Sequence, residues 1–360
     1  MEQHDAGTVG ARWFAAAAFA VVSMAAATAS HAQPGKPAGS APPPRTSSTA
    51  AAAPPSPLPG CSLRGTIPMG KSVEVFDAAV GGNVVARFTG ARTPLYVSEL
   101  PADPKASRTL VATSTGGGDA TVRINGWTLA AAIPVFAERD IAAGPHVAIA
   151  KGTRVELLRT AADGLEVQLT IAGTSGQTVR TKAACDALAL APPPASEGSG
   201  TRQWISKGGS IDLYDQPSGN VVFSLRLDGE SVQAFWSTEQ RGAFVRVESR
   251  SDVVLRGWVR VSDLQPVKPG EVRGKYVPPQ APAGSVVRLP EDPPVARVLR
   301  EASVHADAER AAKVIGAVEP GAEVYVLSTI AGYVSVLPKN LGIMAPERKG
   351  FWIAASEIAR

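Results

Sequence analysis

The 360-residue sequence predicts an all-β protein built from small closed barrels or sandwiches. Short runs such as VYVL at 324–327 alternate apolar and polar residues with period 2, between turns rich in Gly, Asn, Asp and Pro. Helical 3.6-residue periodicity does not persist beyond about one turn. One order of signals also recurs four times, which indicates tandem repeats.

The first 60 residues are not expected to belong to the fold. Residues 13–29 form an Ala-rich apolar run, with Arg12 before it and the sequence SHA after it, which is typical of a secretory signal peptide over 1–32. We expect cleavage after Ala32. The alternative is an uncleaved membrane anchor, for which the run is short and weakly apolar. Residues 33–60 contain nine prolines and no acidic or aromatic residue, so they are expected to form a disordered tether.

The compartment follows from this beginning. No later stretch approaches 18 apolar residues, so no transmembrane segment is expected in the mature chain. The protein is therefore predicted to be secreted or periplasmic.

Each repeat begins with an apolar residue and a planar ring, and a turn glycine follows 14 to 16 residues after the ring. Alternating strands come next, and the repeat closes on a Trp with Ile or Leu six residues later. About five short strands are expected over each ~60 residues. The ring residues are Phe76, Phe136, Tyr214 and His305, and the closing positions hold Trp127, Lys182, Trp258 and Trp352.

These signals divide the chain into four repeats. Repeat 2 is degenerate, because Lys182 replaces the tryptophan. A proline-rich linker over 266–297 precedes the last repeat and is expected to hold it apart, which favours multivalent attachment. The predicted boundaries are 61–133 for repeat 1, 134–190 for repeat 2, 203–265 for repeat 3 and 298–360 for repeat 4.

Repeat 4, with KVIGAVEPGAEVYVL, GYVSV and GFWIAASEI, resembles the bacterial SH3-like (SH3b) family. Repeat 3 is similar and carries the closing GWV as Gly257-Trp258-Val259, whereas repeats 1 and 2 match more loosely. The resemblance implies tandem SH3-like β-barrels and a shallow groove of loop aromatics that holds peptides, often those of peptidoglycan. The arginine typical of the opening strand is replaced by the four ring residues.

The resemblance makes aromatic side chains of repeats 3 and 4 the candidates for ligand binding. A recurring ring on a strand is more often a core anchor, and that alternative stays open for each. Trp236 and Tyr333 are expected to be exposed. The candidates are Tyr214, Trp236, Phe244, His305, Tyr325 and Tyr333, and a structural role is expected for Trp127, Trp258 and Trp352.

The only two cysteines are Cys61 and Cys185. Export places them in an oxidising compartment, where two cysteines most often pair. A disulfide between them would clamp repeats 1 and 2 together. The alternative is two unrelated buried thiols.

Catalysis is not expected. The mature chain keeps only His146 and His305, and neither cysteine has a histidine within 35 residues. The sequence contains no G-x-S-x-G motif and no phosphate-binding glycine loop, and two histidines in different repeats do not suit a zinc site. We therefore expect no enzyme activity, no metal and no cofactor.

Charge indicates little about the partner. The whole chain carries +4, and removal of residues 1–32 takes away two acidic residues and one arginine, which leaves +5. There is no run of Lys and Arg, so nucleic acid is not an expected partner. The expectation is an exported protein that binds peptidoglycan or envelope peptides. The alternative is a scaffold for protein interactions with no affinity for glycan.

Overall fold

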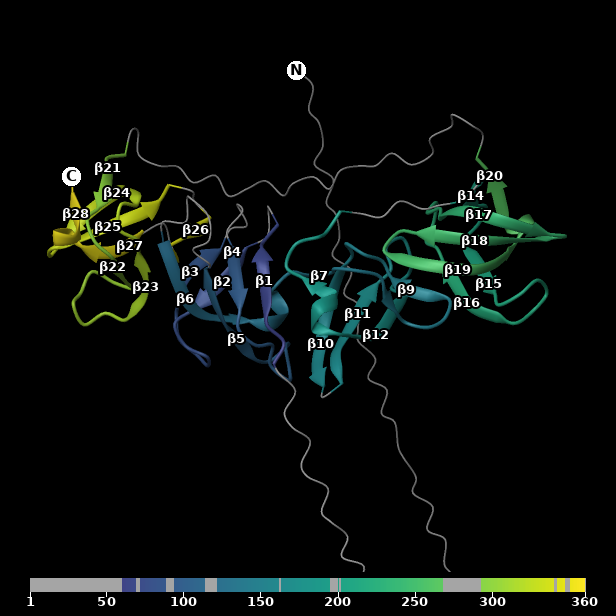
Figure 1. Cartoon of the computed structure of the whole chain (residues 1–360), viewed down its shortest axis with the longest axis horizontal. Helices are drawn as coiled ribbons and strands as arrows, with labels where there is room; N and C mark the ends of the chain where they lie inside the picture. Colours follow the sequence, from purple (N-terminus) through teal and green to yellow (C-terminus); the bar gives the residue numbers. More distant parts are fainter. Residues whose placement is uncertain are drawn as a thin grey trace, which may run out of the picture. The chain divides into compact units, whose positions relative to one another are not determined.

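The computed structural model describes residues 60–68, 72–88, 94–113, 122–161, 163–194, 200, 202–267, 293–339, 342–346 and 350–359. The predicted signal peptide, all but the last residue of the predicted tether and most of the 266–297 linker lie outside these residues. The chain divides into bodies over 1–55 and 56–360, and the described residues belong to the second. Antiparallel strands and short 3-10 helices make up their regular structure, so the prediction of an all-β fold is confirmed (Figure 1).

Repeat 3 shows the strand order most clearly. Its elements are β14 (Arg202–Ser206), β15 (Ser210–Tyr214), β16 (Val221–Arg226), β17 (Ala234–Arg241), β18 (Phe244–Arg250), β19 (Val253–Arg260), η3 (Val261–Asp263) and β20 (Leu264–Pro266). The strands pair in the order β16-β15-β19-β18-β17-β14-β20. This path holds seven strands, where the sequence indicated five, because the short first and last strands carry too few residues to show alternation.

Repeat 4 has the same order, β23-β22-β27-β25-β24-β21-β28, once its elements are named in turn. They are β21 (Val295–Val298), β22 (Ala302–His305), β23 (Val314–Val318), β24 (Glu323–Ile330), β25 (Tyr333–Pro338), β26 (Ile343–Met344), β27 (Phe351–Ala354), η5 (Ala355–Glu357) and β28 (Ile358–Ala359). The first strand pairs with β24 and begins three residues before the predicted start of the repeat at 298.

Repeat 1 contains β1 (Leu63–Thr66), β2 (Val73–Phe76), β3 (Val84–Phe88), β4 (Pro94–Val97), β5 (Arg108–Thr113), β6 (Val122–Leu129) and η1 (Ala130–Ala132). These strands again pair as third-second-sixth-fifth-fourth-first, which is β3-β2-β6-β5-β4-β1. The chain then enters repeat 2 directly, since β7 begins at Val135.

Repeat 2 contains β7 (Val135–Ala137), β8 (Ile141–Ala142), β9 (Val147–Ile149), β10 (Arg154–Ala161), β11 (Gly164–Thr170), β12 (Thr178–Ala183), η2 (Cys185–Ala187) and β13 (Leu188–Ala189). The order β12-β11-β10-β7-β13 follows the same scheme, and β8 pairs with β9. Phe136 lies on the first strand of this repeat, whereas Phe76, Tyr214 and His305 end second strands. The alignment of Phe136 with those rings was therefore wrong, because β8 is only two residues long and has no ring.

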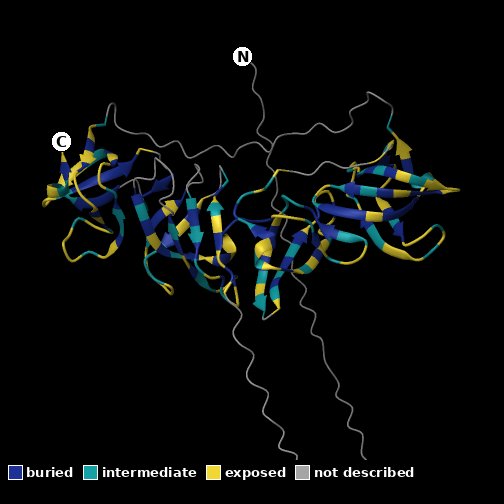
Figure 2. Ribbon diagram, in the orientation of Figure 1, coloured by how far each residue is buried: buried dark blue, intermediate teal, exposed yellow. Residues whose placement is uncertain are grey.

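Burial follows the alternation of strand residues. On β6, Val122 and Ile124 are buried in the core, whereas Arg123 and Asn125 face away from it. Figure 2 shows this change of colour along the strands. Because successive side chains of a strand point to opposite faces, each sheet has a core face and an outer face, and the outer face is the surface available to a ligand.

Repeats 4 and 1 share one sheet. β23 pairs with the first half of β6, with Gly316 opposite Ile124 and Val318 opposite Val122. In return, β26 of repeat 4 pairs with β3 of repeat 1. Two polar contacts join the same repeats, from Arg123 to Glu301 and from the Lys313 ammonium to the carbonyl of Asp77.

Repeats 2 and 3 are joined by strands at the corresponding positions in their repeats. β9, the third strand of repeat 2, pairs with the first half of β19, the sixth strand of repeat 3. The segment between the fifth and sixth strands of repeat 2 lies against the third strand of repeat 3: Gln177 donates its amide to the carbonyl of Ser224 at 2.7 Å, and Thr174 bridges to Leu227. In both joined pairs, a strand edge left open by one repeat is therefore filled by a strand of another repeat.

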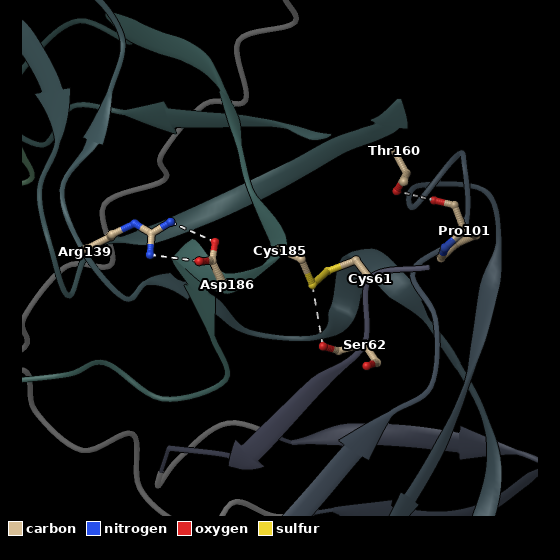
Figure 3. The surroundings of a disulfide bond; sticks show 7 residues. All are labelled: Cys61, Ser62, Pro101, Arg139, Thr160, Cys185 and Asp186. Atoms are coloured by element: carbon tan, nitrogen blue, oxygen red, sulfur yellow. Dashed lines mark hydrogen bonds and ion pairs between the residues drawn. A yellow bond between two sulfur atoms is a disulfide. The ribbon is translucent and has the colours of Figure 1, made fainter. Parts of the chain in front are cut away.

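Repeats 1 and 2 are joined by the Cys61–Cys185 disulfide, whose Cα atoms are 5.5 Å apart, so the predicted pairing is confirmed (Figure 3). The disulfide sulfur of Cys185 lies 3.6 Å from the carbonyl oxygen of Ser62, a contact in which no hydrogen is donated. Thr160 of repeat 2 donates its hydroxyl to the carbonyl of Pro101 at 2.9 Å. Lys105 forms an ion pair with Glu156 at 2.7 Å.

A charged network lies at the contact between repeats 2 and 3. Arg250 of repeat 3 pairs with Asp140 of repeat 2 at 3.1 Å and with Glu248 at 2.6 Å, and Arg256 pairs with Glu248 at 2.9 Å. Burial acts to raise the pKa of the Glu248 carboxyl, but hydrogen bonds from Arg256 and Arg250 and their charges outweigh it. The pKa of Glu248 is therefore lowered from its ordinary value.

We predict that replacing both cysteines, Cys61→Ser with Cys185→Ser, lowers the free energy of unfolding by about 2–5 kcal/mol, because the crosslink closes a loop of 124 residues in the unfolded chain. Urea denaturation measures the loss. A reductant should lower the wild-type midpoint by a similar amount and leave the double variant unchanged. An equal midpoint for all samples would contradict the stabilising role.

We also predict that Glu248→Gln reduces the dependence of stability on acid pH. The pKa of Glu248 is lower in the folded state, so its contribution is present above the unfolded-state pKa and is lost as pH falls through the folded-state pKa. Urea midpoints at neutral pH and at about pH 3 should therefore differ less in Glu248→Gln than in the wild type. Glu230→Gln is the control, because Glu230 has no ion pair among the described residues. Equal pH dependence in Glu248→Gln and the wild type would contradict the prediction.

Candidate ligand-binding faces

The ring that ends the second strand and the tryptophan of the sixth strand are direct cross-strand partners in three repeats. Residues opposite each other in an antiparallel pair lie on the same face of the sheet. The two sequence signals, about 45–50 residues apart, therefore meet at one point. The pairs are Phe76 with Trp127, Tyr214 with Trp258, and His305 with Trp352.

The first residue of the fifth strand completes each set. Phe244 packs edge-on to Tyr214 with ring centroids 5.4 Å apart, and Tyr333 packs edge-on to His305 at the same distance. In repeat 1 the position holds an arginine, whose guanidinium lies 3.6 Å from the centroid of the Phe76 ring. We name these sets ring cluster 1 (Phe76, Arg108, Trp127), ring cluster 3 (Tyr214, Phe244, Trp258) and ring cluster 4 (His305, Tyr333, Trp352).

The ring clusters lie on the outer faces of their sheets. Tyr214, Phe244 and Trp258 pack on one another as a group separate from the main core, at 7, 9 and 7% exposure. Trp352 is also buried, whereas Trp127, His305 and Tyr333 are half-buried. Ring cluster 3 is thus largely covered, and ring cluster 4 offers more of its ring surface to solvent.

Cation–π contacts cover ring cluster 3. Arg241 lies 5.4 Å from the Trp258 ring and Arg260 lies 5.3 Å from the Tyr214 ring, while Arg246 is directly opposite Trp258. Arg241 is paired with Glu239. Neither Arg246 nor Arg260 has an ion pair among the described residues, so this face carries two uncompensated positive charges.

A further ring lies on the fourth strand of three repeats. Trp236 is opposite Glu248 and Tyr325 is opposite Leu337, and both are half-buried. Counted from the closing tryptophan, their counterpart in repeat 1 is Tyr96, opposite Ala112, with the guanidinium of Arg64 at 4.8 Å from its ring. Sequence reasoning missed Tyr96, because the chain between β4 and β5 is longer in repeat 1 than elsewhere; the register of β5 on β6 is the signal that identifies it.

Repeat 2 has no ring cluster. Lys182 occupies the position of the closing tryptophan, opposite Glu166, and its ammonium bonds to Asp163. Glu156 takes the place of the fourth-strand ring, and Phe136 is buried on β7. The outer face of repeat 2 is thus charged where the other three are aromatic.

The remaining polar groups form no second site within the described residues. The Nδ1 atom of His146 lies 3.0 Å from the carbonyl oxygen of Arg256, at the contact between repeats 2 and 3. No three of the described His, Cys, Asp or Glu side chains gather as metal ligands would. A shallow cavity of about 220 Å³ between η1 and the β10–β11 hairpin is lined by Ile133, Leu157 and Leu169, and the ring clusters do not contribute to it.

We predict that Trp258→Ala costs about 3–5 kcal/mol of folding stability, because a side chain at 7% exposure leaves a cavity when it is truncated. Trp236→Ala should cost clearly less, because Trp236 is half-buried at the surface. Urea denaturation of both variants provides the comparison. Equal losses would contradict the division between covered and accessible rings.

Comparisons with known proteins give only a distant likeness. No protein-family model matches the chain, and no curated protein matches it. Among solved structures, NlpC2 and NlpC1 from Trichomonas vaginalis are similar at 11% and 10% identity, with TM-scores of 0.16 and 0.15. The matches cover 45% and 46% of this chain and 49% and 48% of those chains, so the chain spans about half the length of the structures it matches. Support for the strand order and the ring clusters therefore comes from this chain alone. Among the described residues no helix is long and apolar enough to cross a membrane.

Proposed function

We propose that this is an exported, non-catalytic protein of the cell envelope whose SH3-like repeats bind peptidoglycan through the ring clusters. The observation that carries the proposal is the recurrence of a ring cluster at the same register on the outer face of three repeats. Ring cluster 3 packs apart from the main core and is largely covered, whereas Trp127, His305 and Tyr333 of the other two clusters are half-buried and leave ring surface for a ligand. Aromatic side chains are favoured at binding surfaces because they offer a large contact area at low entropic cost.

The charges on these faces support a wall polymer as the ligand. Arg246 and Arg260 border ring cluster 3, and Arg64 and Arg108 lie over rings of repeat 1. Guanidinium groups bind carboxylates with two parallel hydrogen bonds. The peptides of peptidoglycan carry carboxylates, so rings and arginines together suit both parts of such a ligand.

The disulfide supports the compartment. Disulfides persist in oxidising spaces outside the cytoplasm and are rare within it. The Cys61–Cys185 bond is therefore what an exported protein would have. The signal peptide over 1–32 and its cleavage after Ala32 remain part of the proposal.

A second candidate function is a scaffold without affinity for glycan. The pairing of β23 with β6 and of β9 with β19 favours it, because shared sheets make stiff connections between repeats. In that case the ring clusters only cover the outer faces of the sheets. Binding to purified wall separates the two functions.

The test is co-sedimentation of the mature protein with purified peptidoglycan at low and physiological salt. Binding is expected, and it should weaken with salt because surface charges contribute. Arg246→Gln with Arg260→Gln should reduce the affinity roughly thirtyfold, if each of the two lost charge-assisted hydrogen bonds contributes about 1 kcal/mol. Tyr333→Ala should also weaken binding with little loss of stability.

Arg180→Gln is the matched control, since Arg180 is an exposed cation of repeat 2 that bonds to Gln168 away from any ring cluster. No binding at low salt would remove the proposal and favour the scaffold. Binding that Arg180→Gln lowers as much as the ring-cluster variants would show nonspecific attraction by net charge.

A further inference from the structure

We propose that ring clusters 1 and 4 form one composite surface that binds a single extended strand of wall polymer across the joined sheet of repeats 1 and 4. This inference rests on the proposed function and adds how the ligand is held, because one extended strand contacts both ring clusters at once. It follows from the pairing of β23 with β6, which places two ring clusters on one sheet although their corresponding residues are about 225 to 230 positions apart in the chain.

The cross-strand partners show that both ring clusters face the same side. Arg123 lies on the outer face of β6 with Trp127, four residues on in a strictly alternating strand. Arg123 is opposite Ala317, and Ala317 is opposite Ser303. Since directly opposite residues share a face, Ser303 continues the outer face onto repeat 4.

The same reasoning continues to ring cluster 4. His305 is two residues from Ser303 on β22 and is opposite Trp352, which is opposite Ser335. Tyr333 is two residues from Ser335, so it also lies on this face. The face therefore runs from Trp127 to Tyr333 without a change of side.

The spacing suits one strand of polymer. His305 is two strands from Trp127 and two residues further back along the strand direction, which places their Cα atoms roughly 12 Å apart at about 4.8 Å per strand and 3.4 Å per residue. An extended peptide covers that distance in about four residues. Lys313 lies between the ring clusters, where its ammonium bonds to the carbonyl of Asp77.

Charge complementarity identifies the occupant. Arg64 and Arg108 lie on the outer face of repeat 1. Arg108 is opposite Leu129, which shares the outer face of β6 with Trp127, and Arg64 is opposite Tyr96, which is on the same face. Neither has an ion pair among the described residues, and Arg108 donates to the carbonyls of Ala78 and Gly81 through its Nη1 atom, which leaves its other two nitrogens for the ligand. An anionic strand with carboxylates, as in peptidoglycan, would contact these two guanidinium groups and the rings together.

Gly316 allows the repeats to approach. A Cβ atom at this position would lie closer than 3.0 Å to the carbonyl oxygen of Arg123, and its nearest neighbours all belong to Arg123 and Ile124 of repeat 1. A side chain at position 316 would therefore clash with the backbone of repeat 1 and not with repeat 4 itself. Gly316→Val is expected to separate β23 from β6 and leave repeat 4 folded.

The experiment compares affinities for purified peptidoglycan. Leu110→Asp changes repeat 1 opposite Trp127, and Ile330→Asp changes repeat 4 opposite Tyr333; the two side chains are 39% and 54% exposed, so both variants should fold. On a composite surface each single change, and also Gly316→Val, should lower the affinity at least about tenfold, because two linked contacts act together. Gly208→Ala is the control, since nothing lies within 4 Å of its added Cβ.

Amide hydrogen exchange reports on the joined sheet itself. In Gly316→Val, exchange should increase over 122–124 while β24 and β25 stay protected. Loss of protection throughout repeat 4 would mean misfolding, and then Leu110→Asp and Ile330→Asp decide. The composite surface would be overturned if Leu110→Asp and Ile330→Asp each lower the affinity no more than twofold and Gly316→Val, with β23 separated from β6, binds as the wild type does. The proposed function would then still stand. Absence of wild-type binding would overturn both.

Discussion

The pairing of open strand edges is the interaction on which the arrangement of the repeats depends. A repeat of about 60 residues can close its own core only in part, and its third strand is left with unpaired N–H and C=O groups. The chain satisfies many of these groups with strands from other repeats: β23 pairs with β6, β9 with β19 and β3 with β26. In both docked pairs, the third strand of one repeat pairs with the sixth strand of the other, so the same arrangement occurs twice.

Local pattern predicted the strands and much of the ring clusters, because period 2 shows which residues share a face. Trp258 and Tyr214 could be singled out from their recurrence in the sequence. Their contact could not, because the register that joins them is set by hydrogen bonds between strands. The pairing of Gly316 with Ile124 could not be predicted either, since residues far apart in the sequence leave no periodic signal. A glycine within a strand is the only trace of it.

The degenerate repeat illustrates a different limit. Phe136 satisfied the apolar-ring pattern, yet it is a core residue of a first strand, because the second strand of repeat 2 is too short to carry the signal. Lys182 was identified correctly as the residue in place of tryptophan, since it lies six residues before Leu188, the spacing that the other repeats have between the tryptophan and the closing Ile or Leu. Patterns are thus reliable where the spacing between signals is kept and misleading where a strand is too short to carry its signal. The charged outer face of repeat 2 fits its place between two neighbours, where Asp140 contributes to the contact with repeat 3.

The contact between the last and first repeats also has a kinetic consequence. Repeat 4 leaves the ribosome after repeat 1, yet β6 in repeat 1 needs β23 to complete its edge. Contacts of such long sequence separation form slowly, because a large loop must close before they are gained. Until then the edge of β6 is open to pairing with other chains. Folding yield should therefore be limited by how soon repeat 4 becomes available, and a chain truncated before repeat 4 would be more prone to aggregate.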